Sequence, residues 1–455
     1  MPKRNSLVMR FGQDNVQVSG PVNARIVGSL LPGILLGIAG ILFVSFSFRL
    51  FEPTLSRLSA HGWWTFVYRP SLLWFSMGMS LLAVRTLLWF SYRPMPPASH
   101  EDAPSLTVLI PAFNEGPMVR KSIASCVAAD YPPGKLEVIV IDDGSTDTTW
   151  AHIEQAAKDY PGLVRAIRFP ANRGKRAALA AGFDAATGEI AVTVDSDSII
   201  ERSALLAIAG PFRNPGIGAV GGKVAVFNRF QAFLPRMLHV RYVLSFDFLR
   251  SVQSTYGAVY CCPGALSAYR LSLIRKILPA WLNQRFLGAA CTTGEDRALT
   301  NDVLALGYKT VYQGSAVVHT IAPETYGKLC KMYLRWDRSY IREELRLLSS
   351  IVWKLPLPAL LLTLLEKSIT NLRYPVGYLS LALLVTLSIS DPWTLVRVLI
   401  SIGLASLFYT LYFLRSERSW EFFYGVAYAY FSAFTLLWVF PFALLTLRSR
   451  SWMTR

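Results

Sequence analysis

Long apolar runs lie near both ends of this 455-residue chain, whereas its middle alternates short apolar and polar segments. Residues 26–48 and 71–92 are each long enough to cross a bilayer as a helix. Four further apolar segments follow near the C-terminus, at about residues 351–365, 374–389, 395–414 and 422–447. The first of these is short and contains Lys354, so a position at the membrane surface is an alternative to a span. The pattern predicts an integral membrane protein with two N-terminal spans (residues 26–92), about four C-terminal ones (residues 351–447) and a polar domain between them.

Residues 104–325 have the periodicity of an α/β domain. Strands are expected at residues 106–110, 136–141, 164–169 and 190–194. Helices are expected at residues 115–129 and 175–186, and a further helix follows the second strand and ends at residue 158. Strands that alternate with helices in this way form right-handed βαβ units and a mostly parallel sheet. In such sheets ligands bind at the carboxyl ends of the strands, where this chain has several polar clusters.

The flanking segments indicate the side of the membrane on which the middle domain lies. Residues 1–25 form a polar, basic lead, and residues 326–348 form a basic amphipathic stretch that is expected to lie on the membrane surface. Because basic ends favour the cytosol, the lead, the middle domain and the tail of residues 448–455 are expected to be cytosolic, at a plasma (inner) membrane. Six spans place the tail there. Five spans place it outside, unless the last segment re-enters the membrane.

Composition changes this picture little. Only 16% of the residues are charged, against about 25% in an average soluble domain. The net charge of +17 raises the question of nucleic acid. No zinc-ligand spacing, RNA-binding signature or basic low-complexity tail is present, so we expect no nucleic-acid partner and assign the charge to membrane lipid and an anionic substrate. The five cysteines all lie in the middle section without metal-ligand spacing, which indicates reduced thiols in a cytosolic domain.

The strand at residues 190–194 ends in Asp195-Ser196-Asp197. Two carboxylates separated by one residue can bring their oxygens together on a hard cation, and Mg²⁺ or Mn²⁺ is often shared with substrate phosphates. An isolated Asp-Ser-Asp is more often a solvated turn. The neighbouring motifs decide between these readings.

Six motifs occur in one order along the chain. They are Pro111–Glu115, Asp142–Asp147, Asn172–Arg176, Asp195–Asp197, Thr293–Arg297 and Arg335-Trp336. In this order and between membrane segments, they resemble a processive membrane glycosyltransferase of family 2, the layout shared by cellulose, chitin and hyaluronan synthases. The resemblance implies a cytosolic GT-A domain, a Rossmann-like α/β fold with a mostly parallel sheet, combined with an α-helical transmembrane region.

Further stretches resemble hyaluronan synthases and their relatives, chitin synthase and the nodulation chitooligosaccharide synthase. Residues 250–254 are similar to the acceptor helix of that group, and residues 261–270 to its acceptor loop. The acceptor residues implied are Arg250, Gln253, Cys261 and Gly264. Residues 452–455 resemble the gating motif of the family, which implies that Trp452 and Arg455 close over bound nucleotide.

The resemblance also implies roles on the donor side. Asp143 would bind the uridine of a UDP-sugar, Lys175 the diphosphate, and Asp195 the ribose and metal. Asp197, with Asp195, would hold the Mg²⁺ or Mn²⁺ ion.

On the acceptor side, Asp296, next to Glu295, would act as the base that an inverting transfer needs. Arg335 and Trp336 would hold the diphosphate and the acceptor sugar. Each residue also has a plain structural reading, such as a turn, a helix cap, a solvated lysine or a membrane-interface anchor.

These inferences predict a processive inverting glycosyltransferase that extends a growing polysaccharide from UDP-sugars and passes it across the membrane. Two positions depart from hyaluronan synthases: Met332 stands where a Gln is usual, and Lys223 where an acidic residue is usual. Both touch sugar recognition. One alternative is a non-processive family-2 transferase that adds a sugar to a lipid-linked or oligosaccharide acceptor. Another is a transporter or scaffold with a degenerate transferase domain.

Overall fold

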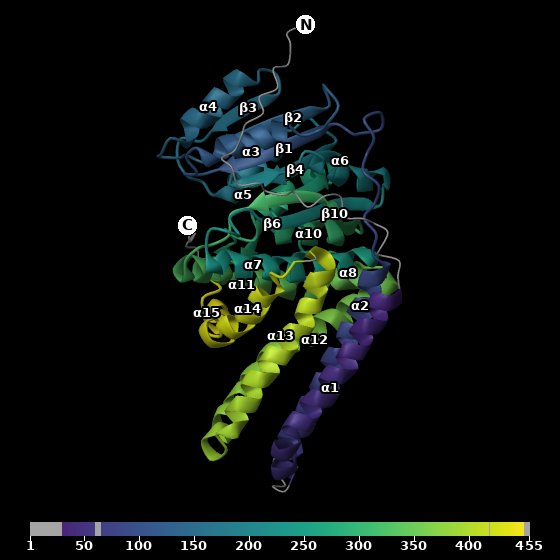
Figure 1. Cartoon of the computed structure of the whole chain (residues 1–455). Coiled ribbons are helices and arrows are strands. Elements are labelled where there is room, and N and C mark those ends of the chain that lie inside the picture. The colour runs from purple at the N-terminus through teal and green to yellow at the C-terminus, as the bar shows by residue number, and fades with distance from the viewer. Residues whose placement is uncertain (1–29, 60–64, 418, 450–455) are drawn as a thin grey trace.

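The middle domain is built on one eight-stranded sheet with the strand order β3-β2-β1-β4-β7-β6-β10-β5 (Figure 1). The computed structural model describes residues 30–59, 65–417 and 419–449. The strand bounds are β1 Leu106–Ala112, β2 Leu136–Asp142, β3 Val164–Arg168, β4 Ile190–Val194, β5 Ser198–Ile200, β6 Ile217–Val226, β7 Leu266–Arg270 and β10 Lys309–Thr320. Strands β1 to β4 run parallel, as do β6 and β10, whereas β7 and β5 run antiparallel to their neighbours. The predicted mostly parallel α/β sheet is therefore confirmed.

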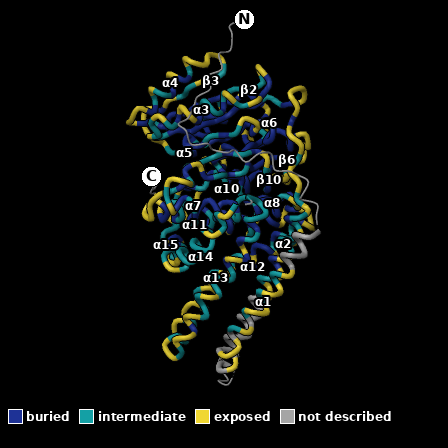
Figure 2. The backbone as a smooth tube through the Cα atoms, in the orientation of Figure 1, coloured by how far each residue is buried: buried dark blue, intermediate teal, exposed yellow. Residues whose placement is uncertain are grey.

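Helices cover both faces of the sheet because its strands alternate buried side chains between two apolar cores. On one face Val108 and Val140 belong to a core shared with α3 (Met118–Val127), α4 (Thr149–Asp159) and α6 (Ala204–Ala209). On the other face Leu109 and Ile139 belong to a core shared with α5 (Lys175–Ala185), α9 (Leu271–Leu282) and α10 (Glu295–Ala305). Figure 2 shows this part of the molecule as its most buried region. The alternation explains why the strands read as continuous apolar runs.

The expected helix over residues 115–129 starts later than the sequence pattern indicates. Asn114 and Gly116 have φ angles of 54° and 55°, which no α-helical residue adopts. Backbone N–H groups of this turn bind the side chains of Ser145, Asp147 and Thr149 instead. The first turn of the expected helix is therefore a loop at the carboxyl end of β1, and α3 begins only at Met118.

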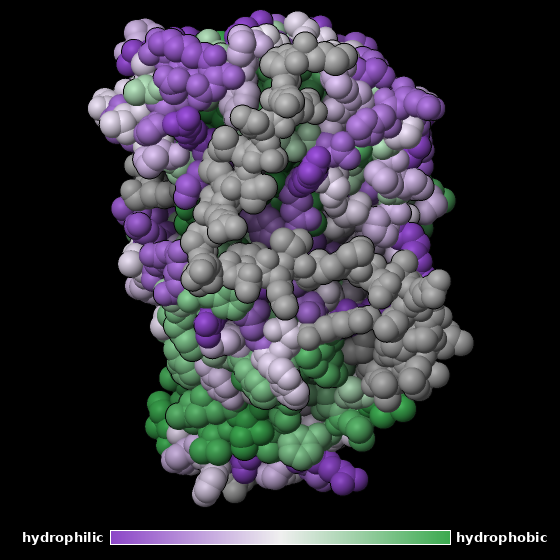
Figure 3. Space-filling model, turned by 45° about the horizontal axis from the view of Figure 1, so that its top comes forward, coloured by the Kyte–Doolittle hydropathy of each residue, from purple (hydrophilic) through white to green (hydrophobic). Residues whose placement is uncertain are grey.

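Four long helices project from one side of the sheet domain: α1 (Leu30–Ser59), α2 (Thr65–Ser91), α12 (Leu357–Ser390) and α13 (Trp393–Glu417) (Figure 1). Within the described residues, α12 and α13 are long and apolar enough to cross a membrane, and α14 (Phe422–Thr435) with α15 (Val439–Leu445) could together form a third span. Figure 3 shows hydrophobic residues gathered in the lower part of the view and hydrophilic residues over the sheet domain. This division of the surface matches a domain that stands on a membrane.

The described C-terminal residues divide into helices differently from the four expected apolar segments. Residues 351–365 and 374–389 do not form two segments, because one helix, α12, continues through the polar stretch between them. Its side chains there have partners. Glu366 accepts hydrogen bonds from Arg85 and Gln253, and Lys367 forms an ion pair with Glu344. The polar stretch between the two expected segments is therefore helical, and its side chains pair with residues of neighbouring helices.

The last apolar segment is a helix pair bent by 49° rather than one straight helix. Its beginning follows Glu417, which lies 2.9 Å from Lys223 on β6 of the sheet domain. Its end lies against α11 (Tyr326–Arg346), the helix that follows the sheet domain, since Thr446 accepts a hydrogen bond from Arg338. Val439 and Ala443 of α15 pack against α11 as well. The pair therefore returns to the side on which it starts.

Candidate active site

Polar loops meet where β1, β2 and β4 end, and Asp143 organises one of them. Its Oδ1 accepts a hydrogen bond from the N–H of Arg173 (2.7 Å), and its Oδ2 accepts one from the N–H of Gly174 (2.9 Å). Burial raises the pKa of Asp143, and the two backbone bonds offset part of that rise. Asp143 therefore holds the loop that leads into α5, whose first residue is Lys175.

Lys175 joins two carboxylates that are a hundred residues apart in the sequence. Its Nζ lies 2.5 Å from Asp195 Oδ1 and 3.1 Å from Glu295 Oε1. Burial opposes the charge of Lys175, but Asp195 and Glu295 outweigh it and raise its pKa. These three residues line one pocket together with Asp296 and Gly264. A cation between carboxylates at a helix start is a suitable place for a diphosphate, which would compete for its N–H groups.

Glu295 and Asp296 are adjacent at the start of α10 but have different electrostatic surroundings. Burial opposes ionisation of Glu295, yet Lys175 and, more weakly, Arg335 lower its pKa. Burial and the charge of Glu295 raise the pKa of Asp296. Asp296 Oδ2 accepts a hydrogen bond from the N–H of Gly264 (3.3 Å). The pair thus separates into a fixed counter-charge, Glu295, and a carboxylate with greater basicity, Asp296.

Two predicted acceptor residues contact Asp296, and a third does not. The Cys261 thiol lies 3.5 Å from Asp296 Oδ2 and donates to it, and burial raises the pKa of Cys261 to about 11. A Cβ added at Gly264 would lie 3.1 Å from Lys175 Nζ, so this loop passes close to the donor side as well. Gln253, in contrast, donates to Glu366 of α12 (3.1 Å) and anchors α8 (Leu249–Thr255) to the membrane helices.

Arg250 lies under an aromatic cluster that contains Trp336. Its guanidinium carbon is 4.2 Å from the ring centroid of Phe246, and the rings of Phe246 and Tyr242 are each 6.1 Å from that of Trp336. Arg250 is only 6% exposed, and among the described residues no atom accepts a hydrogen bond from its Nη1. A buried donor of this kind needs a partner that the described side chains do not supply, such as water or a polar ligand. The sequence analysis missed Tyr242 and Phe246, whose spacing of one helical turn was the available signal.

The residues after β4 fit a divalent cation by their chemistry. Asp195 lines the pocket, and Asp197 is 3% exposed, with its Oδ1 3.2 Å from the hydroxyl of Ser198. Among the described residues, no group of three or more His, Cys, Asp or Glu side chains could hold a metal. Carboxylates such as Asp195 and Asp197 suit a hard cation whose other ligands are substrate oxygens and water. The predicted gate residues Trp452 and Arg455 lie outside the described residues.

The eight-stranded sheet, with Lys175, Asp195 and Asp296 together in one pocket at its edge, defines the class as a GT-A glycosyltransferase. The sequence profile of glycosyl transferase family 2 matches residues 107–278. An N-acetylglucosaminyltransferase of Rhizobium leguminosarum bv. viciae is 32% identical over 363 residues, which cover 77% of this chain and 82% of that protein. One of Mesorhizobium japonicum is 34% identical over 251 residues, or 55% of this chain and 59% of that protein. The chain belongs to glycosyltransferase family 2.

A solved structure agrees with the fold. It is a mannosyltransferase from Pyrobaculum calidifontis in complex with GDP-Man and Mn²⁺. The two chains share 19% identity with a TM-score of 0.52, over 83% of this chain and 96% of that one. At this identity the likeness shows the fold alone.

Proposed function

We propose that this chain is a processive, inverting transferase that builds a β-linked polysaccharide from UDP-sugars and passes it across the plasma (inner) membrane. The observation that carries the proposal is the single pocket in which Lys175, Asp195 and Asp296 meet. In this proposal Lys175 binds the diphosphate, and Asp296 acts as the base on the opposite side of the reacting carbon. The relatives named as N-acetylglucosaminyltransferases support UDP-N-acetylglucosamine as a first donor to test.

In the proposed reaction, Asp296 takes the proton of the acceptor hydroxyl as its oxygen bonds to the anomeric carbon. The bond from that carbon to the diphosphate breaks, and the configuration inverts. Lys175 faces the charge that develops on the leaving diphosphate. A raised pKa suits Asp296 as a base because a more basic carboxylate drives the proton transfer better.

A divalent cation, Mg²⁺ or Mn²⁺, would be held by Asp195 and Asp197 and would supply further stabilisation of the diphosphate. Asp143 would contribute to the nucleotide site from the neighbouring strand end. Activity is therefore expected to disappear in a chelator and to return when either ion is added in excess.

The acceptor is proposed to lie against Trp336, with Arg250 and Cys261 on either side of its path to Asp296. Stacking of a sugar ring on Trp336 leaves its hydroxyls free to reach the base. The bent pair α14–α15 brings the end of the described chain to α11, which supports a role for Trp452 and Arg455 in closing the nucleotide site.

The test is an assay of the detergent-purified chain with UDP-sugars, singly and in pairs, following UDP release and product length. We expect UDP release with at least one UDP-sugar. We also expect long products even when few chains have been started. The Asp296→Asn variant serves as the inactive control. A product with one added sugar would favour the non-processive alternative, and release only from other nucleotide-sugars would contradict the proposed donor.

A further inference from the structure

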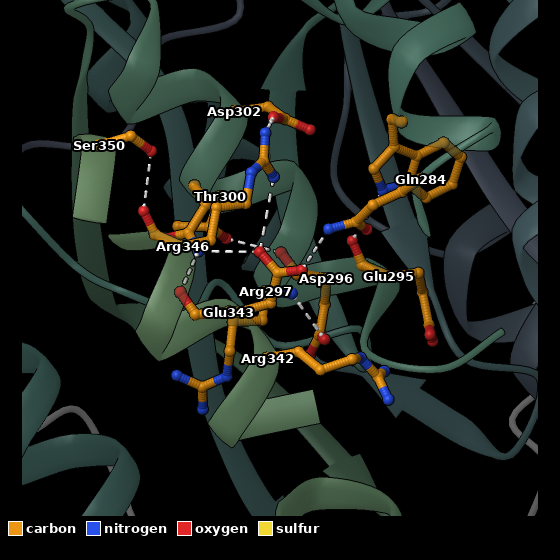
Figure 4. Close-up of polar contacts among 12 residues, drawn as sticks. Gln284, Glu295, Asp296, Arg297, Thr300, Asp302, Arg342, Glu343, Arg346 and Ser350 are labelled. Atoms are coloured by element: carbon orange, nitrogen blue, oxygen red, sulfur yellow. Dashed lines mark hydrogen bonds and ion pairs between the residues drawn. The ribbon is translucent and has the colours of Figure 1, made fainter. Parts of the chain in front are cut away.

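A buried carboxylate on α11, Glu343, lies outside the pocket and is the centre of a polar network. It is 2% exposed. Its Oε1 accepts a hydrogen bond from Gln284 Nε2 (2.6 Å), and its Oε2 accepts one from Asn301 Nδ2 (2.9 Å). Arg346 Nη1 lies 3.5 Å from the same Oε2. Figure 4 shows Glu343 among Gln284, Arg342 and Arg346. Both carboxylate oxygens are thus fully engaged by donors.

One branch of the network reaches the donor side of the pocket. Gln284 Oε1 accepts a hydrogen bond from Arg176 Nη1 (2.9 Å), and Arg176 directly follows Lys175 in α5. Arg176 also donates to the carbonyl of Trp281 (2.7 Å), whose indole N–H donates to the carbonyl of Glu295 (3.3 Å). A displacement of Glu343 would therefore act on the helix start that carries Lys175.

A second branch reaches the helix of the base. Asn301 is on α10, five residues after Asp296, and its Nδ2 also donates to the backbone carbonyl of Glu343 (3.0 Å). Arg346 of α11 forms an ion pair with Asp302, the next residue of α10. These contacts oppose both sliding of α10 along α11 and rotation of α10 about its own axis.

The position of Glu343 on α11 connects this network to the acceptor side. Glu343 follows Trp336 by seven residues, or two helical turns, so both lie on nearly the same face of α11. The same helix carries Arg335. Glu343 is thus the point at which the helices carrying Lys175, Asp296 and Trp336 are joined.

We propose that Glu343 is a positioning residue that sets the acceptor platform on α11 in register with the base on α10 and the lysine on α5. The residue touches neither substrate nor the reacting atoms and acts through the placement of these helices. The inference rests on the proposed function for the roles of Lys175, Asp296 and Trp336, whereas the transferase class itself is shown.

The test uses Glu343→Gln, which keeps the shape of the side chain but replaces one accepting oxygen by a donating NH₂ group. That group faces Gln284 or Asn301, which are themselves donors, so the register of the helices shifts. Transfer to the sugar acceptor depends on that register, whereas hydrolysis of the nucleotide-sugar by water needs no acceptor platform. We expect the ratio of transfer to hydrolysis to fall about 10- to 100-fold.

Two variants separate positioning from general loss of structure. Glu344→Gln changes the adjacent buried carboxylate, which is 6% exposed and whose hydrogen bonds and ion pair are with Lys367 and Asn371 on α12. It should lower the melting temperature without changing the ratio. The double variant Glu343→Gln with Gln284→Glu exchanges amide and carboxylate, restores a donor–acceptor pair beside Arg176, and should recover most of the ratio.

All chains are assayed in full length with whichever nucleotide-sugar the wild type hydrolyses. If the wild type uses no UDP-sugar, the proposed donor is contradicted. The ratio of transfer to hydrolysis can then still be measured with the nucleotide-sugar that it does use. An unchanged ratio in Glu343→Gln, or an equal fall in Glu344→Gln, would overturn the positioning role. Failure of the exchanged pair to recover the ratio in a folded chain would also count against it.

Discussion

At the scale of single residues, the chemistry of the pocket depends on the different partners of Glu295 and Asp296. The two carboxylates are neighbours in the chain, yet Glu295 lies 3.1 Å from the Lys175 ammonium while Asp296 accepts from a thiol and a backbone N–H. The lysine makes Glu295 a permanent counter-charge, and that counter-charge in turn makes Asp296 more basic. One lysine therefore organises both roles.

This arrangement predicts the pH dependence of transfer. Asp296 acts as a base only when ionised, and its raised pKa means that activity is lost on acidification at a higher pH than for an ordinary aspartate. In Glu295→Gln, the negative charge that raises this pKa is gone and Lys175 loses a partner, and both changes lower the pKa of Asp296. The acidic limb of kcat/KM against pH should therefore move to lower pH.

The control for this measurement is Asp296→Asn, which should lower kcat by about 10²- to 10⁴-fold across the whole pH range. Binding of the nucleotide-sugar should persist in it, since Lys175 and Asp195 are unchanged. An acidic limb that stays in place or moves upward in Glu295→Gln would contradict the assignment of the base.

At the scale of elements, the start of α10 depends on Gly294. This residue has a φ of +78°, and a Cβ built on it would lie 2.3 Å from Cβ of Ser339 on α11. The missing side chain lets α11 approach the turn that carries Glu295 and Asp296. The close approach of the two helices is thus a local requirement of the site.

Gly294→Ala should destabilise the chain by about 1–2 kcal/mol from the left-handed backbone alone, with a further cost from the contact with Ser339. Thermal unfolding in detergent measures the loss, and the transfer rate should fall with it because Asp296 is displaced. The double variant with Ser339→Gly removes the contact but not the backbone strain, so it should recover only part of the stability. Complete recovery, or none, would show that one of the two causes is absent.

Features that depend on nearby residues in the sequence could be predicted, whereas those that depend on contacts between distant residues could not. Strands such as β4, Ile190–Val194, could be predicted because their apolar runs and end motifs are local. The closeness of Asp143, Lys175 and Asp195 could be predicted because their motifs each stand next to a strand end or helix start. The continuity of α12 could not, because the polar side chains of Glu366 and Lys367 are stabilised by partners on distant helices. Glu343 could not either, since no local pattern marks a residue that joins three helices.

At the scale of the whole molecule, α11 lies between the catalytic domain and the membrane helices and is bound to both. Glu343 faces α10 and Gln284, while the next residue, Glu344, forms a 2.7 Å ion pair with Lys367 of α12. On another side, α15 packs against α11 near Arg338. The helix that carries Arg335 and Trp336 therefore has a fixed position relative to the long apolar helices, as the proposed path of the polymer requires.

The bent pair α14–α15 leads to a prediction about the side on which the chain ends. Because the pair begins beside the sheet domain and ends against α11, Ser449 should be on the catalytic side of the membrane, as a gate over the nucleotide requires. Single cysteines at exposed serines test this with a membrane-impermeant maleimide. Ser390→Cys, at the far end of α12, should be labelled in intact cells, whereas Ser349→Cys and Ser449→Cys should react only after permeabilisation. The parent chain measures the background from its native cysteines, of which four are buried and Cys261 is partly buried. Labelling of Ser449→Cys in intact cells would mean that the pair crosses the bilayer, and Trp452 and Arg455 could then not reach the active site.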